Sequence, residues 1–178
     1  MSGQWQRIAK KYDPLAVGSI DGTDTEPHDM GIVRAINNEY IPDASLPGDA
    51  SCTLFVGRLH PRVDEEELEH FFNKYGKVKS CTVIRDIVTG FSKQYGFVEF
   101  EKHHHAERAY RTCHRTILHG VEFLVDWEFG RTMKGWKPRR MGGGFGGQKE
   151  SGQLRFGCRY RQWRAPIIPE KDRSKQNK

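Results

Sequence analysis

The 178-residue sequence contains only four cysteines, and no two of them lie close together in the chain. Zinc ribbons and secreted disulfide scaffolds need closely spaced cysteines, so both classes are excluded. The mean hydropathy is −0.75, and no segment approaches the roughly 18 apolar residues of a membrane span. The N-terminal string MSGQWQRIAKKYDP lacks the apolar centre of a signal peptide. We therefore expect a soluble protein of the cytosol or nucleus, with no membrane partner.

Patterns that would indicate an enzyme or a metal protein are also absent. His103, His104 and His105 are consecutive, so on a helix they point in different directions and do not converge on one ion. No HExxH pair occurs, and the glycine-rich stretch at 142–147 lacks the Lys-Ser/Thr ending of a P-loop. We predict no catalytic residues, no metal and no cofactor.

The net charge of +6 is distributed very unevenly along the chain. Residues 1–50 hold 4 Lys/Arg against 8 Asp/Glu, and residues 51–128 are nearly balanced, at 11 against 12. Residues 129–178 hold 14 against 3, a local charge of +11. Such asymmetry points to nucleic acid or another anionic partner.

Three regions follow from composition and periodicity. Residues 1–50 form an acidic N-terminal extension, in which the spacing of apolar residues predicts a short helix over 29–40. Residues 51–129 form the regular domain. Residues 130–178 form a basic extension rich in Gly, Arg and aromatic residues, whose glycine run at 142–147 is expected to be flexible rather than packed.

The regular domain alternates between strand and helix periods. Apolar residues spaced as in amphipathic helices follow Asp64, a good N-cap, and recur from residue 106 to residue 113. Strands are predicted at residues 53–57, 78–85, 95–100 and 121–127. The order βαββαβ predicts an α+β, ferredoxin-like fold, in which two helices cover one face of a four-stranded antiparallel sheet.

Aromatic side chains are predicted on the other face of that sheet. Side chains alternate along a strand, so if Leu54 and Val56 face the helices, Phe55 faces away. By the same parity Tyr95 and Phe97 face away on the third strand. Exposed rings in this number are costly unless a partner stacks on them, and unpaired nucleobases suit that role.

Two strings carry a family resemblance. LFVGRL at residues 54–59 and KQYGFVEF at residues 93–100 resemble the two ribonucleoprotein motifs of the RNA recognition motif family. The resemblance implies that Phe55, Tyr95 and Phe97 stack on RNA bases and that Lys93 meets phosphate. Gln94 stands where the family usually has glycine, and its amide is a further candidate RNA contact.

Other candidate RNA-binding residues are polar or basic. The alternation of side chains along the fourth strand points Asp126 away from the helices, where it can accept hydrogen bonds from base amino groups. A solvated carboxylate is an equal alternative. Phosphate contacts are predicted for cations beside the sheet and in the basic extension, where one tryptophan either stacks on RNA or packs against the sheet. These candidates are Arg58, Arg85, Lys134, Trp136, Lys137, Arg139, Arg140 and Arg155.

The flanking strings narrow the resemblance. KGWKPRRMGGGFGG at residues 134–147 resembles RNA recognition motif proteins of the spliceosomal small nuclear ribonucleoproteins. The strings at residues 8–29 and 149–157 are similar to the minor-spliceosome branch of that group. The resemblance implies a nuclear protein that binds U11 small nuclear RNA and pre-mRNA at the 5′ splice site of minor-class introns, beside other protein subunits of the particle.

Two alternatives remain open from the sequence. In the first, the domain is a protein-interaction module and the basic extension is merely solvated. In the second, the chain is a general mRNA-binding regulator without a fixed particle.

Overall fold

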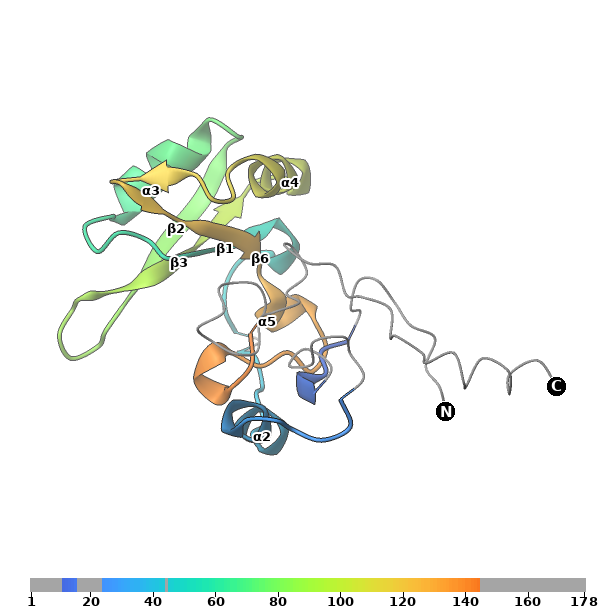
Figure 1. Ribbon diagram of the computed structural model, residues 1–178. Helices are drawn as coiled ribbons and strands as arrows, with labels where there is room; N and C mark the ends of the chain where they lie inside the picture. The colour runs from blue at the N-terminus through green and yellow to red at the C-terminus, as the bar shows by residue number, and fades with distance from the viewer. Residues whose placement is uncertain (1–10, 16–23, 44, 145–178) are drawn as a thin grey trace, which may run out of the picture. The chain divides into compact units, whose positions relative to one another are not determined.

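The computed structural model describes residues 11–15, 24–43 and 45–144 (Figure 1). They form two compact units. One unit is Pro42–Thr132, and the other joins described residues before Pro42 to described residues after Thr132. The first unit contains the predicted regular domain at 51–129 and adds short segments at both of its ends.

The first unit has the predicted fold. Its sheet consists of β1 (Thr53–Gly57), β2 (Val78–Arg85), β3 (Ser92–Phe100) and β6 (Leu124–Trp127), in the antiparallel order β2-β3-β1-β6. Helices α3 (Glu65–Asn73) and α4 (His103–Thr112) cover one face (Figure 1). The α+β, ferredoxin-like prediction is therefore confirmed. None of the helices in the described part of the chain is long and apolar enough to cross a membrane.

Helix α3 begins where the sequence predicts. The Asp64 carboxylate accepts a hydrogen bond from the backbone N–H of Glu67 at 2.9 Å, which caps the first turn. Three glutamates in that turn lie at the positive end of the helix dipole. Leu68 and Phe72, four residues apart on one face of the helix, are fully buried. The capping residue therefore predicts the same helix start as the apolar spacing, and the apolar spacing also determines which face of α3 is buried.

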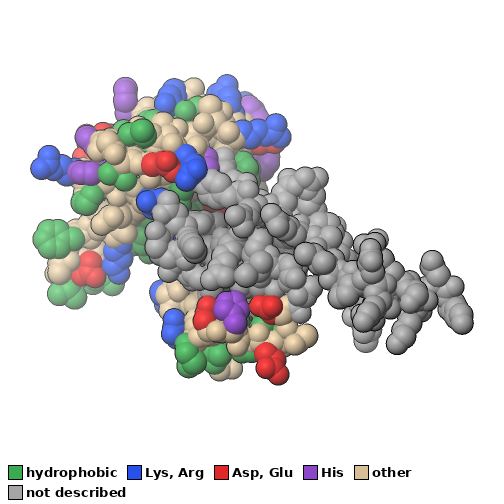
Figure 2. Space-filling model, in the orientation of Figure 1, with side chains coloured by type: hydrophobic (Ala, Val, Ile, Leu, Met, Phe, Trp, Pro, Cys, Tyr) green, Lys and Arg blue, Asp and Glu red, His purple; other side chains and the backbone are tan. Residues whose placement is uncertain are grey.

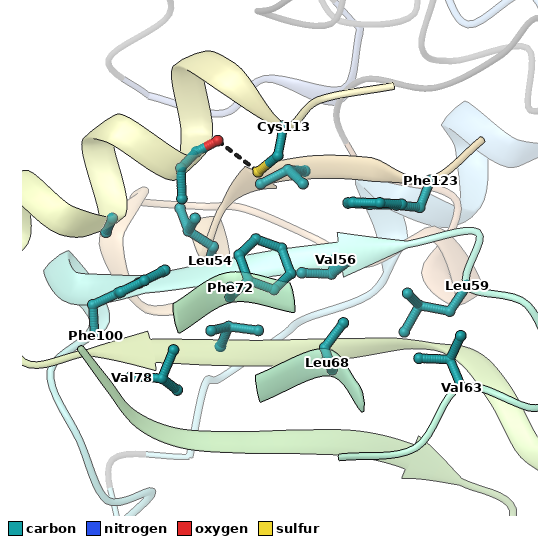
Figure 3. Packing of buried hydrophobic residues seen from close by; sticks show 14 of the residues in the cluster. Leu54, Val56, Leu59, Val63, Leu68, Phe72, Val78, Phe100, Cys113 and Phe123 are labelled. Atoms are coloured by element: carbon teal, nitrogen blue, oxygen red, sulfur yellow. Dashed lines mark hydrogen bonds between the residues drawn. The ribbon is translucent and has the colours of Figure 1, made fainter. Parts of the chain in front are cut away.

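The hydrophobic core lies between the sheet and the two helices (Figure 3). Leu54 and Val56 reach it from β1, and Phe72 packs there edge-to-face against Phe100 and Phe123. Cys113 closes one end, with its thiol directed at the carbonyl of Ala109 (Figure 3). The core residues are Leu54, Val56, Leu59, Val63, Leu68, Phe72, Val78, Val83, Val98, Phe100, Ala106, Ala109, Cys113, Phe123 and Val125.

The predicted fourth strand, 121–127, is two elements in the structure. Residues Val121–Glu122 (β5) pair with Ile117–Leu118 (β4) as a small hairpin, and the sheet strand β6 starts only at Leu124. The hairpin loop is His119-Gly120, and both residues have positive φ (51° and 73°). Two positive φ values match the twist of a tight hairpin. The His-Gly pair is a weaker sequence signal than Asn-Gly, and the prediction missed it.

The second unit contains the predicted N-terminal helix. Helix α2 (Met30–Asn37) starts after Asp29, whose carboxylate accepts from the N–H of Ile32 at 2.8 Å. The predicted end at residue 40 was three residues too late. Ile32 and Ala35 are buried, as is Tyr12 in the preceding segment. The Tyr12 N–H donates to the carbonyl of Lys134 at 3.0 Å, which ties residues from the two extensions together.

The glycine run does pack in its described part. Gly142, Gly143 and Gly144 are buried. A Cβ on Gly142, whose φ is 88°, would lie 2.0 Å from the carbonyl oxygen of Gly31 on α2. Glycine is needed there because the two backbones approach so closely. The expectation of a flexible run was thus wrong for Gly142–144, and the rest of the run, 145–147, lies outside the described residues.

Glu99 is the buried carboxylate of the sheet, with only 8% of its surface exposed. It accepts hydrogen bonds from the Lys79 ammonium at 2.8 Å, from the Asp49 N–H at 3.0 Å and from the Ser80 hydroxyl at 3.2 Å. Burial alone would raise the pKa of Glu99, but these donors outweigh it and hold the pKa below its ordinary value. The carboxylate thereby fastens the segment before β1 to the end of β3.

We predict that Glu99→Gln lowers the free energy of unfolding by about 1–3 kcal/mol at pH 7, because charge-assisted hydrogen bonds are lost. Since the pKa of Glu99 is lowered by folding, its contribution is complete above the ordinary value of 4.5 and disappears as the pH falls through the folded pKa. Denaturant unfolding at pH 7 and pH 3 should show the two chains converging in acid. Glu101→Gln, at an exposed ion pair with Lys77, is the matched control and should change little at either pH.

Candidate nucleic-acid interface

Three aromatic rings lie together on the sheet face opposite the core. Phe55 comes from β1, and Tyr95 and Phe97 come from β3. The centroid of the Phe55 ring lies 5.8 Å from that of Phe97 and 5.9 Å from that of Tyr95. All three side chains are half-buried. We call these three residues the ring face. Their placement agrees with the predicted side-chain parity.

Strand register explains why the rings meet. Phe55 is paired with Phe97, and Gly57 is paired with Tyr95. Gly57 is on the same side of β1 as Phe55, two residues further along. A Cβ at Gly57 would lie 2.9 Å from the Phe55 ring, so the missing side chain lets that ring lie along the strand. The arrangement leaves one broad apolar surface of the kind on which flat bases stack.

Asp126 lies beside the ring face. It is the register partner of Phe55 on the opposite side of β1 from Phe97. Its carboxylate accepts from the N–H of Trp127 at 2.9 Å, which orients the side chain. Trp127 itself packs on the other side of the sheet, where its ring centroid lies 5.2 Å from that of Tyr110 on α4. The structure therefore brings Asp126 to the rings, while Trp127 belongs to the packing around the core.

The basic candidates near the sheet are differently placed. Lys93 on β3 forms an exposed ion pair with Asp86, with 3.7 Å between nitrogen and oxygen. The Arg85 guanidinium lies 2.7 Å from the carboxylate of Glu65 on α3. Helix α3 covers the opposite face of the sheet, so the structure holds Arg85 at that helix and not among the rings. Lys93 remains the better placed of the two for a phosphate on the ring face.

Gln94 has a left-handed backbone, with φ of 62°. Its carbonyl accepts from the N–H of Leu59 at 2.9 Å, and its N–H donates to the Ser92 hydroxyl at 3.0 Å. Arg58, at the end of β1, is exposed and is also left-handed, with φ of 59°. A left-handed position favours glycine, which is the residue that the sequence resemblance leads one to expect in place of Gln94.

The candidates of the basic extension belong to the other unit. Trp136 is half-buried and packs edge-on against Tyr40, with 5.6 Å between ring centroids. The Lys137 ammonium donates to the carbonyl of Asn38, just after α2. Lys134, Arg139 and Arg140 are exposed. Trp136 thus packs on Tyr40 within its own unit, whereas the sequence suggested stacking on RNA or packing against the sheet. Arg155 lies outside the described residues.

The sequence did not reveal what closes one end of the ring face. Glu99 follows Phe97 on the same side of β3, and there it holds the N–H of Asp49. Arg131 donates to the carbonyls of Leu46 and Gly48 and pairs with Glu128, which keeps this segment in place. The outward direction of the Glu99 side chain was predictable from the alternation along the strand, but Asp49, the partner that brings in the segment before β1, is 50 residues away in the chain.

We predict that Gln94→Gly is more stable than Gln94→Ala by about 1 kcal/mol, because glycine alone adopts the left-handed backbone without a steric cost. Alanine is the matched control, since it removes the same side-chain amide but keeps a Cβ. Thermal and denaturant unfolding of both variants measure the difference. Equal stabilities would show that the backbone at this position is not strained.

Residues 54–123 match the RNA recognition motif family. The chain is 52% identical over 164 residues to the U11/U12 small nuclear ribonucleoprotein 35 kDa protein of Danio rerio, covering 92% of this chain and 79% of that protein. The Xenopus laevis protein of the same name is 51% identical, with 92% of this chain and 60% of that protein covered.

A relative with a different name is more distant. The U1 small nuclear ribonucleoprotein 70 kDa homolog of Schizosaccharomyces pombe is 39% identical over 122 residues, covering 67% of this chain and 47% of that protein. The similarity to the U11/U12 proteins is higher and also includes the flanks of the domain. The chain therefore belongs to the family of the U11/U12 small nuclear ribonucleoprotein 35 kDa proteins.

Proposed function

We propose that this protein is a non-catalytic RNA-binding subunit of the minor-spliceosome U11/U12 particle. Its role there is to bind U11 small nuclear RNA and to assist recognition of the 5′ splice site in pre-mRNA. The observation that carries the RNA-binding part is the contact of Phe55, Tyr95 and Phe97 on one side of the sheet. The names of the relatives support the particle.

The ring face binds unpaired bases by stacking. Each base stacked on an aromatic ring contributes about 1–3 kcal/mol, and this contribution depends little on sequence. Asp126, the neighbour of Phe55 across β1, accepts hydrogen bonds from base amino groups. That contact discriminates bases with an amino group from those without one. Stacking thus supplies affinity, and the carboxylate supplies part of the specificity.

Lys93 neutralises a phosphate next to the stacked bases. In the free protein its ammonium is 3.7 Å from the Asp86 carboxylate, and both side chains are well exposed. Exposed pairs of this kind are worth about 0–1 kcal/mol, so an RNA phosphate displaces Asp86 at little cost. The contact fixes the register of the RNA on the sheet.

The basic extension adds sequence-independent affinity. Lys134, Arg139 and Arg140 are exposed cations, and each phosphate that they neutralise releases counterions from the RNA. Trp136 and Lys137 act mainly within their own unit, because the first packs on Tyr40 and the second donates to Asn38. Arg155 is proposed as a further phosphate contact from its sequence context alone.

The acidic residues before the domain are proposed to face protein. Residues 1–50 hold twice as many acidic as basic side chains, which makes them poor RNA ligands. We propose that their partners are other protein subunits of the particle. We also propose that the particle is located in the nucleus. The two alternatives, a protein-interaction module and a general mRNA regulator, both predict no preference for U11 RNA.

A double substitution tests the ring face. We predict that Phe55→Ala with Phe97→Ala weakens binding to U11 small nuclear RNA by about 1–3 kcal/mol for each stack that is lost. Phe91→Ala, which removes an exposed phenylalanine outside the ring face, is the matched control and should bind normally. Equilibrium binding with circular dichroism of each variant measures the effect in folded protein. Unchanged affinity of the double variant would rule out stacking on this sheet.

A further inference from the structure

The loop between β2 and β3 ends in three exposed apolar side chains. Ile87 is 98% exposed, Val88 is 93% exposed and Phe91 is 76% exposed. We call these three residues the apolar tip. Figure 2 shows hydrophobic side chains gathered at the end of this loop. Single apolar residues are common on protein surfaces, but three within five positions form a patch that water solvates poorly.

The loop under the apolar tip is held in one shape. The Asp86 carboxylate accepts hydrogen bonds from the N–H groups of Val88 and Thr89 and from the Thr89 hydroxyl, at 3.0–3.1 Å. The Asp86 backbone bonds to Phe91 and to Gly90 at 2.8 Å in each case. Gly90, with φ of 73°, completes the turn. The apolar side chains are therefore presented by a preformed turn, and ordering them on a partner costs little entropy.

The fold itself does not use the apolar tip. None of its three residues belongs to the hydrophobic core or packs against it. The hydrogen bonds of Asp86 and Thr89 shape the turn whatever side chains stand at positions 87, 88 and 91. A polar turn would serve the hairpin equally well, so the apolar residues point to an interaction.

Charge favours a protein partner over RNA. Residues 87–91, IVTGF, carry no charge, and the Asp86 carboxylate is occupied by the turn. Of the nearest basic residues of the hairpin, Arg85 is paired with Glu65 on the helix side of the sheet, and Lys93 is assigned above to a phosphate on the ring face. A surface that meets phosphates carries cations or other donors, and the three side chains of the apolar tip offer neither. Ile87 and Val88 are aliphatic and offer no ring on which a base could stack, so the apolar tip complements a pocket that is itself apolar.

We propose that the apolar tip inserts into an apolar pocket on another protein subunit of the particle, while the ring face holds the RNA. The inference rests on the proposed function, because it takes the particle as the place where the partner is found. It adds a second, chemically separate contact to the chain. The protein then connects RNA and protein through two adjacent parts of one hairpin, β2–β3.

Site-specific crosslinking in the assembled particle tests the proposal. The photo-crosslinking residue p-benzoylphenylalanine replaces Phe91 in one full chain and Ile117 in another. Ile117 is the matched control, since it is also apolar and 66% exposed but stands alone on β4. Mass spectrometry of the particle should show position 91 joined to one peptide of one protein subunit, at several times the yield from position 117.

A variant in which the apolar tip is made polar provides a second test, by RNA affinity and by the rate of leaving the particle. We expect Ile87→Ser, Val88→Ser and Phe91→Ser together to leave the affinity of the isolated chain for U11 RNA within about twofold. The same variant should leave the purified particle about tenfold faster or more, because buried aliphatic and aromatic side chains contribute that much to a complex. Normal RNA affinity also shows that the variant is folded.

Three results would overturn the proposal: a crosslink from position 91 mainly to RNA, one to a second copy of this chain, or no yield above that of position 117. A wild-type chain that never enters the particle would instead contradict the proposed function. The two failures are therefore distinguishable in one experiment.

Discussion

The antiparallel register of β1 on β3 is the constraint on which the fold and the candidate site both depend. In this register Phe55 stands opposite Phe97, and Leu54 stands opposite Val98. Phe55 and Phe97 lie on the ring face, and Leu54 and Val98 lie in the core. A slip of one residue would exchange the two faces of the slipped strand, exposing core residues and burying a ring. Core formation therefore selects the register that presents the rings.

The two ends of the ring face differ in chemistry. At one end Glu99 binds Lys79, Ser80 and the N–H of Asp49, so that the segment before β1 is fastened to the sheet. At the other, Gln94 and Arg58 adopt left-handed backbones where β3 begins and β1 ends. Lys93, beside Gln94, offers a cation for phosphate. The ring face lies between these two ends.

Local patterns were sufficient to predict the sheet, the helices and the parity of the rings. The bounds of β1 and β2 were right because their apolar residues have a strand period, and Asp64 marks the start of α3 through its side chain. The same parity rule placed Asp126 on the outward face of its strand, and the pairing with Phe55 is what the structure adds. These features follow from residues within about ten positions of one another, so they are visible in a single sequence.

Features made by distant residues were not predictable in this way. The burial of Gly142 depends on Gly31 of α2, more than 100 residues earlier, and nothing near Gly142 signals that contact. Arg85 was predicted as an RNA contact, and the structure adds an ion pair with Glu65 of α3 that the sequence did not indicate. For Trp136 the sequence left stacking on RNA and packing against the sheet open, and the structure shows it against Tyr40 instead. In each case a tertiary contact selects one role from several that the residue type allows.

Recovery of the RNA crosslinked to the full chain in nuclei, with mapping of the crosslinked residues, tests the central claim most directly. The account predicts that U11 small nuclear RNA is strongly enriched and that its unpaired bases are joined to Phe55, Tyr95 or Phe97. Dispersed messenger RNAs without U11 enrichment, or crosslinks confined to residues away from the ring face, would contradict it.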